Sequence, residues 1–350
     1  MQCTLLIPHL WWSRDAGDEA YRDLALPELQ TLLARARRRS FPAIGWEAWL
    51  CQAFEVQRQR DWPIAPLTLT IDGGNPGDAY WLRADPVHLR PHRDQLLLAD
   101  SHAFAVAQDE ADALISALNA HFEIDGLRFS APRPDRWYLR LETDPGIATH
   151  PLDEVAGAAI DRCLPAGEHA LRWHRISNEI QMLLHDHAVN EAREAKGDPP
   201  INGVWLWGGG RRAAAHGRHF SAVGSDDALS LALAANADIP VTPPADDGEH
   251  WLRAAHDTAR PSDHPLLVLT QLTGAAHRGD LDAWRSDLDG LNRRWLAPLL
   301  AALKAGPIMQ LVLVAPGRAG CERFELTRAA RFKFWRRPRP LAAYAPSASP

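Results

Sequence analysis

The sequence predicts an α/β fold, with a mostly parallel sheet and helices on both faces, plus a smaller inserted α+β subdomain. Short, continuous apolar segments at residues 265–272 and 308–314 are typical of parallel strands that are covered on both sides. An amphipathic helical segment, residues 281–303, lies between them, and Pro298 must kink or split it. Strand, helix and strand in this order favour a parallel sheet with crossover helices.

Composition excludes several classes of protein. The 350 residues are 46% apolar, which is enough for a substantial core, and the net charge of −6 does not indicate a nucleic-acid partner. The four cysteines lie far apart without zinc-site spacing, as expected in a reducing cytoplasm. Residues 4–10 are too short to span a bilayer. We therefore expect a cytoplasmic protein without a membrane segment.

The first 78 residues are expected to form the N-terminal part of the α/β core. Residues 3–7 have the pattern of a first core strand, and residues 27–38 that of a helix with leucines on one face. The arginine-rich run at residues 35–39 is interpreted as the solvated C-terminal end of that helix. The turn-forming residues 72–77 then mark a boundary.

Residues 79–150 are expected to form the inserted α+β subdomain, and residues 151–340 a helical lead-in followed by the C-terminal part of the core. Within the insertion, residues 109–122 carry the clearest helical periodicity in the chain. The last segment, residues 341–350, is rich in proline and alanine, so we expect a disordered tail.

A glycine-rich segment follows a predicted strand at residues 204–207. Gly208, Gly209 and Gly210 precede Arg211 and Arg212, so backbone N–H groups and two guanidinium groups could hold a phosphate. The spacing matches neither a Walker loop nor a dinucleotide fingerprint. A simple change of chain direction is an equally good explanation of the glycines.

Three further features have competing explanations. Asp85 could form an acid–base pair with His88, but pairing with Arg83, two positions away on the same strand face, is favoured. His277 follows a buried strand, where α/β enzymes place site residues. The basic and aromatic residues 331–337 could meet an anionic partner, or could form a cation-protected edge strand.

Three motifs, in this order, resemble the archaeal-type cofactor-independent phosphoglycerate mutases of the alkaline phosphatase superfamily. They are residues 81–85 with 97–101, residues 187–210, and the segment Ala276-His277-Arg278-Gly279-Asp280, which is similar to a metal-binding segment of that family. The resemblance implies an alkaline-phosphatase-like core. The whole chain is also similar to bacterial regulatory proteins of the RpfE type, which are linked to pathogenicity factors and diffusible signals.

The resemblance implies two divalent metals and a phosphoryl-carrying serine, and here the chain departs from the family. The positions expected to hold those groups are occupied instead by Pro8-His9, the serine-free residues 42–47, Thr273, Ala315-Pro316 and Leu326. Of the expected metal ligands, His277 remains. One imidazole cannot hold a metal pair, so we expect no cofactor and no metal site.

We therefore expect a catalytically inactive, phosphoglycerate-mutase-like protein with a regulatory or binding role. Its expected partner is an anionic or phosphorylated small molecule, or a regulatory protein, and nucleic acid is not expected. The candidate ligand-binding residues are Arg83, Gly208, Gly209, Gly210, Arg211, Arg212, His277 and Arg278. The alternative is a divergent mutase or phosphatase that uses Mn or Zn, with His9, Glu47, His277 and Asp280 as its catalytic groups.

Overall fold

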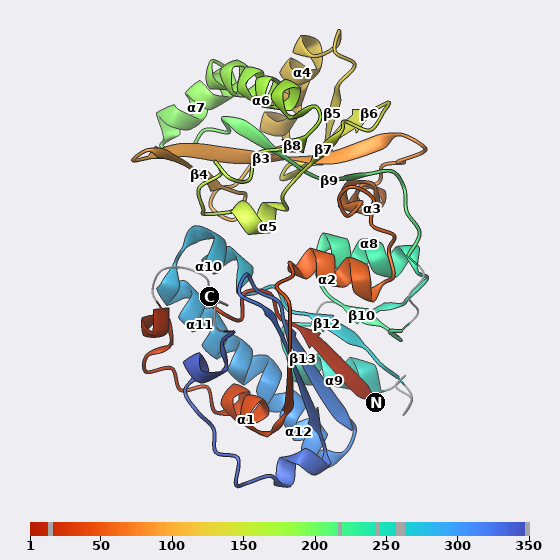
Figure 1. Ribbon diagram of the computed structural model, residues 1–350, viewed down its shortest axis with the longest axis vertical. Helices are drawn as coiled ribbons and strands as arrows, with labels where there is room; N and C mark the ends of the chain where they lie inside the picture. Colours follow the sequence, from red (N-terminus) through yellow and green to blue (C-terminus); the bar gives the residue numbers. More distant parts are fainter. Residues whose placement is uncertain (13–16, 216–218, 243–244, 257–262, 347–350) are drawn as a thin grey trace. The chain divides into compact units, whose positions relative to one another are not determined.

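The computed structural model describes residues 1–12, 17–215, 219–242, 245–256 and 263–346. The chain divides into two compact units (Figure 1). We call Met1–Glu55 with Ala215–Pro350 the core unit, and Val56–Ala214 the inserted unit. Among the described residues, no helix is both long and apolar enough to cross a membrane.

The core unit contains a seven-stranded sheet in the order β11-β10-β12-β1-β13-β14-β2. Its strands are β1 (Gln2–Leu6), β2 (Arg37–Phe41), β10 (Val223–Gly224), β11 (Val241–Thr242), β12 (Leu266–Val268), β13 (Gln310–Ala315) and β14 (Cys321–Thr327). The strand β1 pairs in parallel with both β12 and β13, whereas β14 is antiparallel to β13 and to β2. The predicted α/β fold with a mostly parallel sheet is therefore confirmed.

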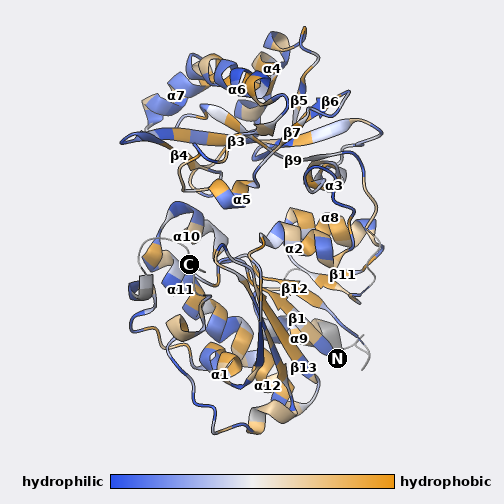
Figure 2. Cartoon of the chain, viewed as in Figure 1, coloured by the Kyte–Doolittle hydropathy of each residue, from blue (hydrophilic) through white to orange (hydrophobic). Residues whose placement is uncertain are grey.

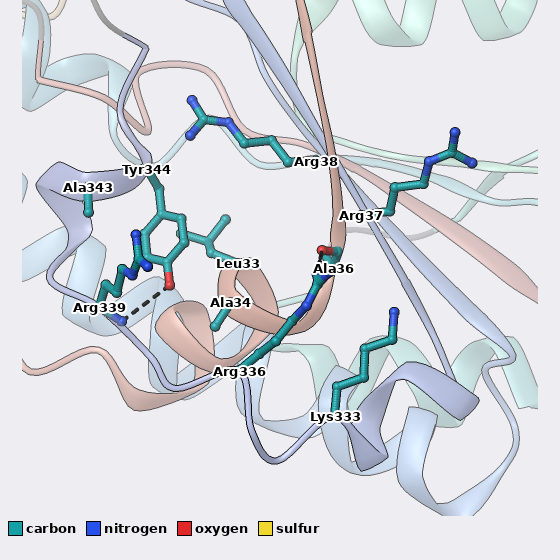
Figure 3. Close-up of a pocket in the computed structure, with 10 residues that line it drawn as sticks. All are labelled: Leu33, Ala34, Ala36, Arg37, Arg38, Lys333, Arg336, Arg339, Ala343 and Tyr344. Carbon is teal, nitrogen blue, oxygen red and sulfur yellow. Dashed lines mark hydrogen bonds between the residues drawn. The ribbon is translucent and has the colours of Figure 1, made fainter.

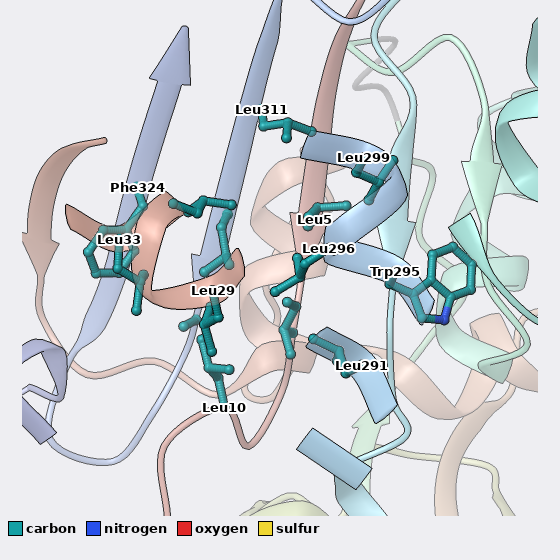
Figure 4. Close-up of a cluster of buried hydrophobic side chains, with 14 of the residues drawn as sticks. Leu5, Leu10, Leu29, Leu33, Leu291, Trp295, Leu296, Leu299, Leu311 and Phe324 are labelled. Carbon is teal, nitrogen blue, oxygen red and sulfur yellow. The ribbon is translucent and has the colours of Figure 1, made fainter. Parts of the chain in front are cut away.

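Helices cover this sheet and bury its apolar strands, which are the orange arrows of Figure 2. They are α1 (Pro27–Arg35), α2 (Trp46–Ala53), α8 (Ala228–Asn236), α9 (Gly248–His256), α10 (Thr273–Arg278), α11 (Leu281–Leu291) and α12 (Ala297–Ala305). Leu29 of α1, Leu299 of α12 and Leu311 of β13 belong to one buried cluster (Figure 4). A π-helical turn, Asn292–Leu296, separates α11 from α12 just before Pro298, as the sequence predicted.

The arginine-rich run is a strand, so its interpretation as a helix end is wrong. The helix α1 ends at Arg35, and Arg37–Phe41 forms β2 at the edge of the sheet, paired with β14. All five side chains of β2 are exposed. Cationic side chains on an edge strand discourage pairing with another chain. That role was considered for residues 331–337, and the structure gives it to β2.

The predicted disorder of residues 341–350 is wrong for the part that the structure describes. Leu341–Tyr344 forms a 3-10 turn, in which Leu341 and Tyr344 are buried in the apolar cluster of the core unit. Burial of these two side chains offsets the entropy lost on ordering the segment. Residues 347–350 lie outside the described part of the chain.

The inserted unit has a five-stranded sheet with the strand order β4-β3-β6-β5, and β9 also pairs with β3. The strands are β3 (Tyr80–His92), β4 (Gln95–Ala99), β5 (Arg128–Arg133), β6 (Arg136–Leu141) and β9 (Gly203–Gly210), and a separate small ladder joins β7 (Ile147–Ala148) to β8 (Ala166–Gly167). The helices are α3 (Ile64–Ile71), α4 (Gln108–His121), α5 (Leu152–Val155), α6 (Ala170–His185) and α7 (Ala188–Lys196). This unit extends beyond the expected insertion at 79–150, because β9 pairs with β3 and α6 contributes to the same apolar cluster.

Candidate functional site

The glycine-rich segment is a buried strand and not a ligand loop. Gly208, Gly209 and Gly210 are the last residues of β9, which lies antiparallel to β3 in the inserted unit. All eight residues of β9 are buried. These glycines thus lie in a strand pairing, and not in the phosphate-holding loop that was one of the two explanations of the sequence.

Close packing explains why glycine occupies these positions. A Cβ atom at Gly209 would lie 2.7 Å from Leu82 Cδ2, and one at Gly210 would lie 2.6 Å from Pro63 Cβ. Gly208 also has a φ of +63°, which is unfavourable for other residues. The three glycines therefore allow β9 to approach its neighbours closely, without any ligand.

The two arginines after the glycines have different surroundings. The guanidinium group of Arg211 donates hydrogen bonds to the carbonyl oxygens of Asp78 and Glu142, and its backbone N–H donates to Gln59 Oε1 at 2.9 Å. Arg212 is exposed. Arg211 therefore ties the end of β9 to neighbouring segments of the inserted unit.

Arg83 is held inside the sheet of the inserted unit. Its Nη2 lies 2.6 Å from Asp85 Oδ1, and its guanidinium carbon lies 5.4 Å and 5.2 Å from the ring centroids of Tyr138 and Trp207. The predicted Arg83–Asp85 pair is therefore confirmed, and the imidazole of His88 instead lies 2.9 Å from the carbonyl oxygen of Pro200. Because its side chain is only 8% exposed, Arg83 stabilises the sheet and does not face solvent.

The environment of Asp85 shows how a buried charge is accommodated. Burial raises the pKa of this carboxyl group, and the charge of Arg83 opposes that rise. Trp207 Nε1 donates to Asp85 Oδ2 at 2.7 Å, and the backbone N–H of Trp137 donates to Oδ1 at 3.3 Å. The carboxylate thus joins three neighbouring strands, β3, β6 and β9, by hydrogen bonds.

In the core unit, two histidines meet after neighbouring parallel strands. His9 follows β1, and His277 lies in α10, which follows β12. Their ring centroids are 5.2 Å apart, and the rings are nearly perpendicular, at 88°. Ligands of α/β proteins bind at this carboxyl edge of the sheet. The sequence placed His277 in such a position, and the structure places His9 beside it.

Two observations distinguish this histidine pair from ordinary packing. The backbone of His9 has a φ of 55°, the left-handed region that non-glycine residues rarely adopt. Thr273 lies one helical turn before His277, and its buried Oγ1 has no hydrogen-bond partner among the described residues. An unsatisfied buried hydroxyl costs about 1–3 kcal/mol, and a polar ligand atom would remove that cost.

The remaining candidate residues of the core unit are Glu47, Asp280 and Arg278. Glu47 is buried in the first turn of α2. Asp280 is the N-cap of α11, where its Oδ1 accepts a hydrogen bond from the backbone N–H of Ala283 at 3.0 Å. Arg278 is the exposed last residue of α10. The capping interaction accounts for Asp280 without a catalytic role.

Comparison with known proteins gives relatives of one kind. A probable 2,3-bisphosphoglycerate-independent phosphoglycerate mutase from Geobacter sulfurreducens is 24% identical over 258 residues, which are 69% of this chain and 63% of the relative. A mutase of the same description from Methanosarcina mazei is 23% identical over 234 residues, which are 63% of this chain and 59% of the relative. The chain therefore spans less than two thirds of these relatives. No protein-family model matches it.

Two solved structures share the fold. A cofactor-independent phosphoglycerate mutase from Thermoplasma acidophilum superimposes with a TM-score of 0.50 at 14% identity, covering 99% of this chain and 95% of that one. A Pyrococcus horikoshii protein gives a TM-score of 0.55 at 14% identity, covering 93% and 87%. The fold is thus of the alkaline-phosphatase-like α/β class. Together with the sequence relatives, it indicates homology to the archaeal-type cofactor-independent phosphoglycerate mutases.

This homology overturns the expectation that the chain uses no cofactor or metal. The relatives are cofactor-independent phosphoglycerate mutases, and enzymes of this superfamily depend on Mn or Zn. The described part of the core unit brings together the imidazoles of His9 and His277, with the hydroxyl of Thr273 on the same helix as His277. The two imidazoles could serve as ligands of one divalent ion but are too few for two.

Proposed function

We propose that the core unit binds a phosphorylated small molecule at the carboxyl ends of β1 and β12, next to one divalent metal ion held by His9 and His277. The observation that carries this proposal is that these two imidazoles, which follow neighbouring parallel strands, have their ring centroids 5.2 Å apart. The homology to phosphoglycerate mutases supports the ligand class, because their named substrates are small phosphorylated acids.

The chain's own groups suit such a ligand. Neutral imidazole nitrogens are good ligands for Mn and Zn, and a bound divalent ion neutralises phosphate oxygens. Thr273 would hydrogen-bond a polar ligand atom and so satisfy its buried hydroxyl. His9 adopts its left-handed backbone conformation in the turn that follows β1.

We further propose that this site does not transfer phosphoryl groups between positions of a substrate. Mutase chemistry needs a side chain that carries the phosphoryl group, and two metals would clamp the attacking and leaving oxygens. At the start of α2, where the resemblance places the serine, the chain has Gly45, Trp46 and Glu47. A binding protein with a regulatory role, as in RpfE-type proteins, is consistent with this loss.

The second candidate is a divergent metal-dependent mutase or phosphatase. The observation that favours it is the unusual backbone of His9 beside His277, because strained conformations concentrate at active sites. In that case His9 and His277 would hold the metal, and Glu47 would be the group available for nucleophilic or base chemistry. Asp280 would act only if it released its helix-capping bond.

The test combines metal content, binding and turnover on the full chain. Protein loaded with MnCl2 or ZnCl2 is expected to retain one metal equivalent by mass spectrometry, and to bind 3-phosphoglycerate in calorimetry with a Kd of about 1 μM to 1 mM. His9→Ala and His277→Ala should lose both properties. His92→Ala, which removes an exposed histidine on β3, is the matched control.

The outcomes separate the two candidates. Binding without product in an enolase-coupled assay, and without hydrolysis of p-nitrophenyl phosphate, supports the binding protein. Turnover that disappears in His277→Ala supports the enzyme instead. Absence of both metal and 3-phosphoglycerate binding would refute the proposed site altogether.

A further inference from the structure

The core unit has a cavity in a part that the proposed function does not use. This cavity of about 590 Å³ is bounded by the end of α1, the start of β2 and the segment after β14 (Figure 3). Its polar lining consists of Arg37, Arg38, Lys333, Arg336 and Arg339. None of the residues that line it belongs to the His9–His277 pair.

The cationic side chains around this cavity are mostly uncompensated. Arg38 forms an ion pair with Glu322, with Nε and Oε2 at 2.7 Å. In the described part of the chain, the other four cations have no carboxylate within ion-pair distance. The chain as a whole carries a net charge of −6. Four unpaired cations around one cavity, in an acidic protein, therefore indicate an anionic ligand with several charges.

The walls of the cavity are held in place by hydrogen bonds within the protein. Arg336 Nη1 donates to the carbonyl oxygen of Ala36 at 3.1 Å, which joins the C-terminal segment to the end of α1. The backbone N–H of Arg339 donates to the hydroxyl oxygen of Tyr344 at 3.2 Å, as the dashed line in Figure 3 shows. Tyr344 is itself buried in the core cluster. These contacts hold the cationic segment against the α1 end of the cavity.

Part of the lining is apolar, which a simple inorganic anion would not need. Leu33, Ala36 and Tyr344 are buried residues at the cavity, and the more exposed Ala34 and Ala343 complete its apolar lining. A ligand that fits both parts has several phosphate groups and one planar or weakly polar group. The volume lies within the range of small-ligand sites, about 300–1,000 Å³.

We propose that this cavity binds a nucleoside polyphosphate, with its phosphate groups at the four unpaired cations and its nucleoside at the apolar lining. Guanidinium groups suit phosphate oxygens because they donate paired hydrogen bonds. The volume of the cavity, about 590 Å³, suits a single nucleotide better than a nucleic-acid strand. The exposed rings of Phe334 and Trp335, on which successive bases could stack, do not line it.

The experiment measures fluorescence anisotropy of N-methylanthraniloyl-ATP and -GTP with the full chain at about 150 mM salt. Saturable binding should be competed by ATP, and AMP should compete at least about tenfold more weakly because it has fewer charges. Lys333→Ala with Arg339→Ala should raise the Kd about 10- to 100-fold. Arg90→Ala, which removes an exposed arginine on β3, should leave it unchanged. His277→Ala should also leave it unchanged, which separates this site from the proposed function.

Each contrary result overturns a defined part of the inference. Lack of saturable binding, or a Kd that the double variant does not change, overturns the site. Inorganic tripolyphosphate that competes as well as ATP overturns the role of the apolar lining. Tighter binding of a single-stranded RNA 12-mer, lost in Phe334→Ala with Trp335→Ala, would show that the surface binds nucleic acid instead.

Discussion

The buried pair in the inserted unit allows a sharp test of the role assigned to Arg83. Asp85→Ala would leave the guanidinium group of Arg83 in the sheet without its carboxylate. The side chains of Arg83 and Asp85 are 8% and 1% exposed, so water cannot replace the lost partner without opening the sheet. Removing one partner of a buried ion pair destabilises a protein by about 3–5 kcal/mol, and we expect a loss of that size.

The contacts of Asp85 make the upper part of this range reasonable. Its carboxylate accepts hydrogen bonds from Arg83 Nε at 3.1 Å and Nη2 at 2.6 Å, from Trp207 Nε1 at 2.7 Å and from the backbone N–H of Trp137 at 3.3 Å. Alanine removes all of them at once. Arg83→Met with Asp85→Leu removes both charges together, so it should recover most of the stability, although Trp207 Nε1 would lose its acceptor.

Urea unfolding, monitored by hydrogen exchange of peptides from β3 and β9, measures this loss of stability locally. Local detection matters because the two compact units need not unfold in one step. Asp94→Ala, in the exposed turn between β3 and β4, is the matched control and should change the free energy by less than about 0.5 kcal/mol. A loss below about 1 kcal/mol for Asp85→Ala would refute the structural role of the pair.

Three further predictions concern packing, pH and capping. Gly210→Ala should destabilise the inserted unit by about 1–3 kcal/mol in thermal unfolding, because the new Cβ would lie 2.6 Å from Pro63 Cβ. Gly290→Ala, whose Cβ would meet only the flexible side chain of Arg294, should be neutral or stabilising, and equal effects would contradict the packing argument. Burial raises the pKa of Asp72, but hydrogen bonds from Arg136 and Tyr138 outweigh it and hold that pKa below its ordinary value. Its contribution to the free energy of unfolding should therefore be present above about pH 4 and be lost as the pH falls through the lowered folded-state pKa. Asp72→Asn should flatten the acid side of a plot of unfolding free energy against pH. An unchanged acid side would show that other groups control it. Asp227→Ala should destabilise the core unit by about 0.5–2 kcal/mol in urea unfolding, because Asp227 Oδ2 accepts the Ser230 N–H at the start of α8, and a change below about 0.3 kcal/mol would remove that role.

Local patterns in the sequence were sufficient to predict the fold class and the Arg83–Asp85 ion pair. Parallel strands buried on both faces produce continuous apolar segments, so β1 and β13 were predicted close to their actual positions. Residues two apart on a strand share a face, which explains why the Arg83–Asp85 pair was predicted correctly. Helix α4 was predicted within one residue at each end, because its apolar residues recur at the helical period.

Capping and strand pairing were harder to predict, because they depend on backbone contacts. Ser225 and Asp227 both have side chains suited to capping a helix, and only the structure shows that Asp227 is the N-cap of α8. Arg37–Phe41 has the composition of a solvated helix end, but its backbone pairs with β14, almost 300 residues later in the chain. A local pattern contains no signal for such a distant partner.

The sequence by itself determined the α/β class, the likeness to phosphoglycerate mutases and the presence of His277 after a core strand. Only the tertiary structure showed that Gly208–Gly210 belong to a strand beside β3, that His9 meets His277, and that cations from β2 and the C-terminal segment surround one cavity. The physical reason is the range of the interactions. Periodicity and propensity act over a few residues, whereas a binding site is assembled from side chains that are distant in the chain and adjacent only after packing.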